Sequence, residues 1–317
     1  MADTPVSAAR QQAGQRMMSR WNWILLFLLG GIWGASFLFA KIAVTQIPPL
    51  MLVFLRVALA CGALHVILRF SGHKFPVTPS MLISFLVMGL LNNAVPFSLL
   101  FWGQTAIGAG LAAILNATTP LFTFLVAALL LRQEPVRPHR AVGVLFGFAG
   151  IVLMLSASLS GLDAAPFRAQ LACLGAACSY AFAAAYAKRF SGLPPLVSAT
   201  GQLTGSTLSM FPAALLTTGS WSSADVSYDV WGYVAALGLV ATGLAYLIYF
   251  RLLADAGATN ASLVTFLVPA SAILLGHVVL EEGLTQIQMG GLGLLLAGLL
   301  VLDGRLLALV RRPEQFR

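Results

Sequence analysis

The feature that most constrains this chain is a series of apolar segments, each about long enough to cross a lipid bilayer. A helix of about 20 residues spans roughly 30 Å of hydrocarbon. The chain is 59% hydrophobic and only 9% charged, whereas soluble domains carry about 25% charged residues. We therefore predict an all-α integral membrane protein with ten transmembrane helices. The predicted spans are 21–41, 49–70, 81–104, 108–131, 141–158, 167–188, 196–218, 231–252, 259–280 and 287–310.

The second half of the chain repeats sequence features of the first. Gly108-Ala109, followed by Ala112 and Pro120, recurs at identical spacing 149 residues later as Gly257-Ala258, Ala261 and Pro269. Three further pairs occur in the same order: Pro48-Pro49-Leu50 with Pro194-Pro195-Leu196, Ala40-Lys41 with Ala187-Lys188, and Ala149-Gly150 with Ala297-Gly298. Five spans per copy would place the second copy upside down in the bilayer. Such inverted repeats are typical of secondary transporters, which bind substrate between the copies near the bilayer midplane.

The predicted organisation follows from the repeat and the charges. We expect a tail at 1–20, a first repeat at 21–158, a second repeat at 167–310 and a tail at 311–317. Lys and Arg concentrate in the tails and the even-numbered connections, and only Lys41 and Arg168 fall on the opposite side. Acidic residues gather on that opposite side: Asp163, Asp225, Asp229, Glu281 and Glu282. The positive-inside rule then predicts that both termini are cytoplasmic in a bacterial inner membrane.

The net charge of +8 is therefore interpreted as a signal for topology and for contact with anionic lipid headgroups, and not for nucleic acid. The apolar stretch that begins at Trp21 runs to Lys41. That is too long for a typical signal peptide, so we expect a retained first span.

Several segments carry a family resemblance. Trp33-Gly34-Ala35-Ser36-Phe37, leading to Ala40-Lys41, resembles the first-span signature of the EamA family of the drug/metabolite transporter superfamily. Leu115-Asn116-Ala117-Thr118-Thr119-Pro120-Leu121 and the segment from Pro269 to Leu280-Glu281-Glu282 are similar to its fourth and ninth spans. One departure is that Pro120 to Glu134 is one residue longer than Pro269 to Glu282. Within the family the chain is most similar to YddG-type aromatic amino-acid exporters. The resemblance implies an exporter of small metabolites with ten helices around a central cavity.

Polar and aromatic side chains inside the spans are candidates for a substrate site, because lipid cannot satisfy a buried polar group. Those in the fourth, seventh and eighth spans recur at helical spacing. The candidate substrate-binding residues are Trp33, Ser36, Asn92, Asn93, Asn116, Thr119, Tyr180, Gln202, Ser206, Tyr246 and Tyr249. Packing between helices is the alternative for each. The spaced glycine pairs Gly30/Gly34, Gly143/Gly147 and Gly201/Gly205 are interpreted as packing positions.

Pro120 and Pro269 are predicted hinges near the middle of equivalent helices. Proline has no N–H to donate to the carbonyl four residues earlier. We therefore expect the carbonyls of Asn116 and Thr265 to be free, and a free carbonyl at midplane can accept a bond from a substrate ammonium. The alternative is a kink that serves shape alone.

Ionisable groups within the predicted spans are few. Arg56 lies about two turns into the second span, where it either contacts a substrate carboxylate, or snorkels to the interface or pairs with a helix-end carbonyl. No Asp or Glu falls inside a span, so only His65 and His277 are placed to carry a proton near neutral pH. We therefore predict uncoupled, facilitated transport, with His277 as the candidate coupling residue if that prediction fails.

Other functional classes lack their motifs. The sequence contains no Gly-x-x-x-x-Gly-Lys-Ser/Thr loop for ATP, no Ser/His/Asp set and no metal-ligand spacing. Cys61, Cys173 and Cys178 fall in spans and are expected to pack. We thus predict no enzyme, no cofactor, no metal and no nucleic-acid partner. The predicted function is export of amino acids, aromatic or otherwise apolar, and related metabolites by alternating access. The alternative is a proton-coupled exporter of drugs or other metabolites that uses a His. We expect a monomer or weak homo-oligomer in contact with lipid.

Overall fold

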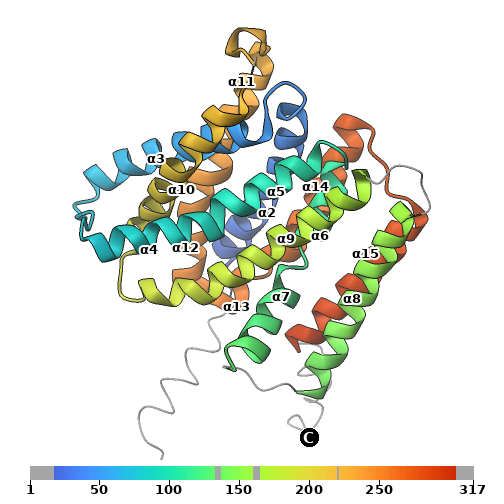
Figure 1. Cartoon of the computed structure of the whole chain (residues 1–317). Coiled ribbons are helices and arrows are strands. Elements are labelled where there is room, and N and C mark those ends of the chain that lie inside the picture. Colours follow the sequence, from blue (N-terminus) through green and yellow to red (C-terminus); the bar gives the residue numbers. More distant parts are fainter. Residues whose placement is uncertain (1–17, 133–136, 160–164, 220, 305–317) are drawn as a thin grey trace, which may run out of the picture.

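The chain folds into a bundle of helices (Figure 1). The computed structural model describes residues 18–132, 137–159, 165–219 and 221–304, and these contain no β-strand. In chain order the elements are α2 (Arg20–Ala43), α3 (Pro49–Phe70), α4 (Pro79–Gly89), η1 (Leu90–Ala94), α5 (Val95–Gln104), α6 (Ala109–Asn116), α7 (Thr119–Leu125), η2 (Val126–Leu130), α8 (Pro138–Leu159), α9 (Ala165–Tyr186), η3 (Ala187–Phe190), α10 (Pro195–Thr217), η4 (Ser223–Asp225), α11 (Tyr228–Ala235), η5 (Ala236–Leu244), α12 (Ala245–Ala256), α13 (Ala258–Ala261), α14 (Val264–Leu280) and α15 (Gln286–Asp303).

The ten predicted spans correspond to helices or to short runs of consecutive helices. Eight of these runs are long and apolar enough to cross a membrane. Of the other two, α14 is shorter, at 17 residues. The helix α10 has 23 residues, but its Ser, Thr and Gln side chains make it less apolar than the eight. The all-α prediction and the count of ten spans in two repeats are therefore confirmed.

Local sequence signals explain where several helices begin and end. Proline starts α3, α4 and α10, where its missing N–H has no helical partner to lose. The hydroxyl of Ser19 accepts from the N–H of Asn22 and caps α2. Thr285 and Gln288 form a reciprocal capping box at the start of α15. These local signals therefore fix the first residues of five of the helices.

Helices at equivalent positions in the two halves make equivalent packing contacts. The first-half helix α2 packs on α14, and its second-half counterpart α9 packs on α6 and α7. Likewise α10 packs on α4, while α3 packs on η5 and α11. Two pairs are their own counterparts: α3 with α10, and α8 with α15. This pattern is what two structurally related repeats require.

The pair α8 and α15 stands at one side of the bundle (Figure 1). Small residues allow this close approach, as predicted for the Gly143/Gly147 pair. A Cβ added at Gly298 would lie 2.5 Å from the backbone nitrogen of Gly147. The other two pairs are also confirmed as packing positions, since a Cβ at Gly34 or at Gly205 would lie 2.4 Å from an atom of a neighbouring helix.

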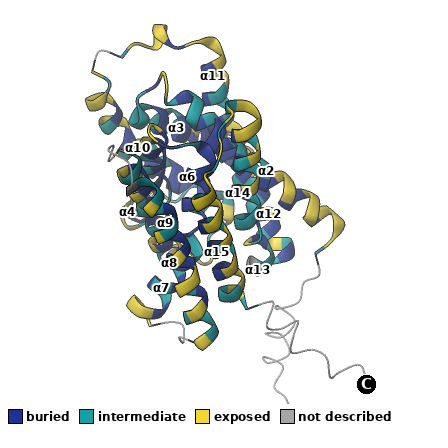
Figure 2. Cartoon of the chain, turned by 90° about the vertical axis from the view of Figure 1, so that its right-hand side faces the viewer, coloured by how far each residue is buried: buried dark blue, intermediate teal, exposed yellow. Residues whose placement is uncertain are grey.

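The centre of the bundle is formed by α6. All of its residues from Ala109 to Leu115 are buried, which is the pattern of a helix surrounded by protein. Figure 2 shows this helix in dark blue in the interior, whereas yellow exposed residues lie on the outer helices. Exposed residues there include large apolar side chains such as Phe27, Leu145 and Leu216, as expected of a surface that faces lipid.

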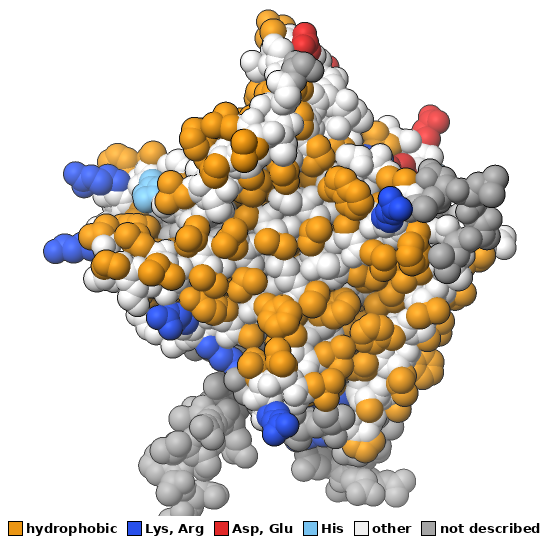
Figure 3. Space-filling view, in the orientation of Figure 1, with side chains coloured by type: hydrophobic (Ala, Val, Ile, Leu, Met, Phe, Trp, Pro, Cys, Tyr) orange, Lys and Arg blue, Asp and Glu red, His pale blue; other side chains and the backbone are white. Residues whose placement is uncertain are grey.

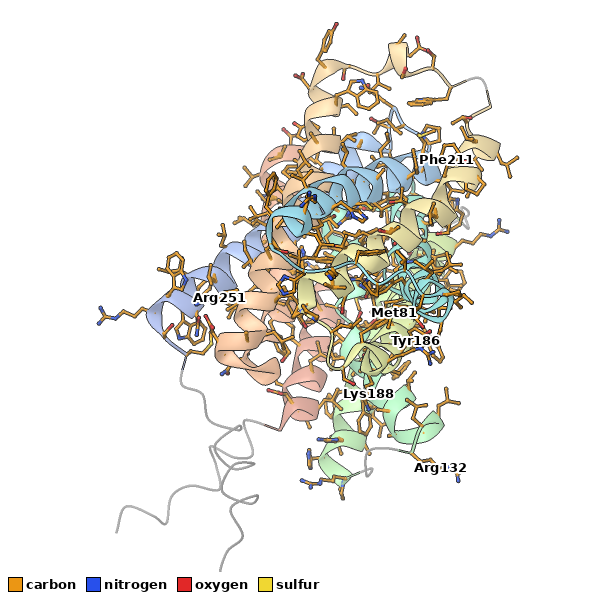
Figure 4. All side chains as sticks on the ribbon, turned by 90° about the vertical axis from the view of Figure 1, so that its left-hand side faces the viewer. Met81, Arg132, Tyr186, Lys188, Phe211 and Arg251 are labelled. Carbon is orange, nitrogen blue, oxygen red and sulfur yellow. The ribbon has the colours of Figure 1, made fainter. Side chains whose placement is uncertain are left out.

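Charged side chains divide between the two ends of the bundle. Acidic groups lie at the top and upper right of Figure 3, and most Lys and Arg lie to the left and at the bottom. In Figure 4, Lys188 and Arg132 lie in the lower part of the view and Phe211 near the top. We call the end where α2, α5 and α14 terminate and α6 begins the Lys41 end.

Candidate functional site

Five predicted side chains form one hydrogen-bonded cluster, which we call the central polar network: Asn92, Asn93, Gln202, Ser206 and Tyr246. The Nδ2 of Asn92 donates to Gln202 Oε1 at 3.0 Å and to the Tyr246 hydroxyl at 3.3 Å. The Tyr246 hydroxyl donates to Asn93 Oδ1 at 2.8 Å. Asn93 Nδ2 in turn donates to Ser206 Oγ at 3.0 Å. The network therefore joins η1 of the first half to α10 and α12 of the second.

The backbone explains why these side chains meet. Asn92 and Asn93 lie on η1, a π-helical turn between α4 and α5. Pro96 follows by one turn and removes one backbone N–H from this stretch. Gln202 and Ser206 are one helical turn apart on α10, and a Cβ at Gly89 would lie 2.5 Å from the Gln202 carbonyl oxygen. The glycine thus lets η1 approach α10 closely enough for side-chain hydrogen bonds.

A second π-helical segment lies at the matching place in the other half. The positions 149 residues after Leu90–Ala94 are 239–243, which fall inside η5. The hydroxyl of Thr242 on η5 donates to the Leu237 carbonyl at 2.9 Å. Extra turns of this kind recur at functional sites because they re-aim side chains. Both π-helical segments carry polar groups of the candidate site.

Arg56 is a buried cation beside this network. It is 6% exposed, and its Nε donates to Thr242 Oγ1 at 2.9 Å. Its guanidinium carbon lies 3.8 Å from the ring centroid of Phe97. Tyr180 and Tyr246 lie within electrostatic range of the cation. Arg56 is thus enclosed by protein, and the predicted alternative of snorkelling does not describe it.

Three of the predicted aromatic residues, Trp33, Tyr246 and Tyr249, form a second group with Phe250. The rings of Trp33 and Tyr249 lie 5.7 Å apart, centroid to centroid. Phe250 contacts both Tyr246 at 6.1 Å and Tyr249 at 5.9 Å. These rings on α2 and α12 adjoin the central polar network through Tyr246. An apolar group bound next to the network would contact ring faces and edges.

Other predicted residues lie apart from the network. The Ser36 hydroxyl bonds within its own helix to the Trp33 carbonyl at 2.7 Å. His277 is exposed at the end of α14, where Nδ1 lies 3.3 Å from the carbonyl oxygen of Glu282. Asn116 Oδ1 is buried and has no hydrogen-bond partner among the described residues. As binding or coupling residues these remain predictions.

The expected geometry at Pro120 is wrong. The fourth span is broken between α6 and α7, so Pro120 lies in the first turn of a new helix. The Asn116 carbonyl, expected to be free, accepts the hydroxyl of Thr119 at 2.7 Å. Threonine supplies the donor that proline cannot, because its hydroxyl reaches back to a carbonyl in the preceding turn. Pro269, in contrast, lies inside α14 as predicted.

The sequence interpretation missed a cluster of polar contacts at the Lys41 end. Lys41 Nζ donates to the carbonyls of Gln104 at 2.8 Å and Ile107 at 3.0 Å, which closes the C-terminus of α5. Glu282 Oε2 accepts the N–H of Ala109 at 2.7 Å, which caps α6. The available signal was the recurrence of Ala-Lys at both first-span ends, which we interpreted only as a repeat marker.

A pocket of about 330 Å³ lies at the same end. Its lining includes Lys41, Gly108, Gln170, Glu282 and Gln288. None of the predicted site residues lines this pocket, so it is separate from the central polar network.

Family comparison agrees with the architecture. The model of the EamA-like transporter family matches residues 21–156 and again residues 167–302. The chain belongs to the EamA-like transporter family. This EamA-like transporter is similar over most of its length to the uncharacterized inner membrane transporter YedA of Escherichia coli K12, with 30% identity over 85% of this chain and 86% of that protein. It is also similar to a probable amino-acid metabolite efflux pump of Salmonella typhimurium, with 28% identity over 90% and 95% of the two chains.

Structural comparison gives the same fold. One crystal structure, at 20% identity, matches with a TM-score of 0.62 over 92% of this EamA-like transporter and 98% of the other chain. The predicted family, the assignment as a transporter and not an enzyme, and the multi-pass membrane location are therefore confirmed.

Proposed function

We propose that this EamA-like transporter exports amino acids and related small metabolites, with a preference for apolar or aromatic side chains. The observation that carries the proposal is the central polar network, which joins the two halves beside a group of aromatic rings. Amide and hydroxyl groups offer both donors and acceptors to a zwitterion, and the rings suit an apolar side chain. The similarity to a probable amino-acid metabolite efflux pump supports the same substrate class.

Transport proceeds by alternating access in this proposal. The contacts Asn92–Gln202 and Asn93–Ser206 cross between the halves, so movement of one half against the other must exchange them for contacts to substrate or water. The proposed orientation has both termini in the cytoplasm, as the positive-inside rule gives. The Lys41 end then faces outward, and the binding residues lie between the repeats 21–158 and 167–310.

Uncoupled transport is the proposed mode. The sequences of the helices that surround the network contain no Asp or Glu away from their ends, and His277 is exposed at a helix end. A proton-coupled carrier requires an ionisable group that alternates between the two sides. The network offers only neutral amides and hydroxyls for that purpose.

The test is uptake by proteoliposomes across a panel of amino acids, with no pH or ion gradient. We expect saturable transport of leucine or phenylalanine and counterflow. Replacement of Gln202 with Leu should reduce transport, whereas Arg251→Gln, which alters an exposed ion pair within α12, should not. Transport that requires an imposed pH gradient would contradict the uncoupled mode. Absence of saturable amino-acid transport would contradict the substrate class.

A further inference from the structure

The charge of Arg56 has no acidic partner in the described part of the chain. Its Nε bonds to Thr242, and its two terminal nitrogens make no hydrogen bond within the described residues. The sequences of α3, η1, α5, α10 and η5, which pack on or next to it, contain no Asp or Glu. A buried cation normally has a counter-charge, because removal of its water is costly. Arg56 is therefore a buried cation without an anionic partner among the described residues.

The contacts of Arg56 fix which part of the guanidinium is available. Its central carbon lies over two aromatic rings, 3.8 Å from the centroid of Phe97 and 5.7 Å from that of Phe101. Thr242 holds Nε from η5, and the Thr242 hydroxyl is itself anchored to the Leu237 carbonyl. Because Nε is the only nitrogen with a hydrogen bond to the described residues, the edge with the two terminal nitrogens is left for a planar acceptor. Carboxylate oxygens match that edge through two parallel hydrogen bonds.

The surroundings favour a ligand with a single negative charge. One guanidinium balances one carboxylate, whereas a phosphate group near neutral pH carries a charge of about −1.5 to −2 and would leave charge uncompensated in a site without a second cation. Tyr246, which lies within electrostatic range of Arg56, connects it to the central polar network. The oxygen atoms Gln202 Oε1 and Asn93 Oδ1 of that network are suitable acceptors for an α-ammonium.

We infer that Arg56 binds the carboxylate of the transported molecule, with Thr242 as the residue that positions its guanidinium. The inference rests on the proposed function for the identity of the substrate as an amino acid. It adds that the carboxylate is required, so amines and amides of the same shape are excluded. The substrate then supplies the counter-charge that Arg56 lacks among the described residues, and loading of the carrier removes an uncompensated charge from the site.

The experiment compares three probes that differ by one group: L-phenylalanine, L-phenylalaninamide without the carboxylate, and phenylacetate without the ammonium. Binding to detergent-solubilised protein is measured by calorimetry and transport by proteoliposome uptake. The variants are Arg56→Gln, Arg56→Lys and Thr242→Val. The matched control is Arg251→Gln, because Arg251 is exposed on α12 and its one ion pair within the described residues is with its own-helix neighbour Asp255.

We expect wild-type protein to bind phenylalanine and to reject the amide. Arg56→Gln should raise the Kd for phenylalanine roughly 10- to 150-fold, the range for loss of a hydrogen bond to a charged group. Arg56→Lys should recover part of the loss, Thr242→Val should weaken binding less than Arg56→Gln, and Arg251→Gln should bind as the wild type does. Thermal unfolding of each variant without ligand shows that its fold is retained.

The outcomes separate the inference from the proposed function. If phenylalanine and its amide bind equally, or if Arg56→Gln leaves the Kd for phenylalanine unchanged, the carboxylate role is overturned although amino-acid transport stands. If phenylacetate binds through Arg56 and phenylalanine does not, the carboxylate role stands and the amino-acid assignment fails. If no probe binds, both are overturned.

Discussion

Replacement of Glu282 with Gln should loosen the closure at the Lys41 end. The Glu282 carboxylate accepts the N–H of Ala109 at 2.7 Å, at the first residue of α6. It also lies within electrostatic range of Lys41, which holds the C-terminus of α5. One acidic side chain from the connection between α14 and α15 thus stabilises the junction between α5 and α6 in the other half. Opening of this end must break the contact.

The magnitude follows from the type of bond that is lost. A hydrogen bond to a charged group contributes about 1.5–3 kcal/mol and a neutral one about 0.5–1.5 kcal/mol. Glutamine has a side chain of the same length and keeps an oxygen acceptor. The substitution should therefore reduce the free energy that favours the closed state by about 1–1.5 kcal/mol. With about 1.4 kcal/mol for each factor of ten, the open fraction of this end should rise about 5- to 13-fold.

The assay is chemical labelling of a cysteine placed behind the closure. Ala112 on α6 is completely buried, and Ala112→Cys is introduced after the three native cysteines are replaced. A membrane-impermeant maleimide is added from outside the cell. If reclosure is faster than labelling, the labelling rate follows the open fraction, so Glu282→Gln should label about 5- to 13-fold faster.

Glu281 provides the matched control. It is the neighbouring carboxylate, is exposed, and ends α14 with φ 55°. Because a surface substitution changes free energies by roughly 0.5 kcal/mol or less, Glu281→Gln should change the labelling rate by no more than about two-fold. Equal labelling rates in Glu282→Gln, Glu281→Gln and the parent would refute the role of Glu282 in closure.

Three further predictions concern packing. Asn93→Leu removes hydrogen bonds to Tyr246 and Ser206 at a fully buried position. It should lower the free energy of unfolding in detergent by about 1–3 kcal/mol, and a stability equal to that of the wild type would contradict this prediction. Gly298→Val should separate α8 from α15 and cost about 1–3 kcal/mol or more, whereas Gly293→Val on the same helix, with nothing within 4 Å, is the control. In the cysteine-free protein, Gly110→Cys with Ile273→Cys should cross-link on oxidation, because the two Cβ positions are 3.7 Å apart and disulfides need about 3.5–4.5 Å. Transport should stop when the cross-link forms and return when it is reduced. Full transport while cross-linked would show that this end does not open.

Most of the fold could be predicted because its signals are local. Apolar length gives the spans, and recurring residues give the two halves. Spacing along α10 placed Gln202 and Ser206 on one face, and the structure joins both to the Asn92-Asn93 pair. Those contacts depend on helical periodicity and on one conspicuous pair of polar residues, both of which are visible in the sequence.

The remaining features depend on contacts between distant segments. Proline in a helix is compatible with a kink or a complete break, and the local sequence does not decide between them. In the fourth span Thr118 and Thr119 supply hydroxyl donors to the Leu115 and Asn116 carbonyls, so a break is accommodated. The contact between Arg56 and Phe97 joins two spans whose relative rotation no sequence periodicity reveals.

The two halves use one sequence pattern in two conformations. After Gly108 the chain forms the eight-residue helix α6 before it breaks, whereas after Gly257 it forms only the four-residue helix α13. The helices α6 and α14 both reach the Lys41 end, where they pack together and Glu282 joins them. At the opposite end α7 packs on α9, and α13 packs on α12. The two segments share Gly-Ala, Ala and Pro at identical spacing. Exchange of the two conformations would transfer the closure from the Lys41 end to the opposite end, which is the change that alternating access requires.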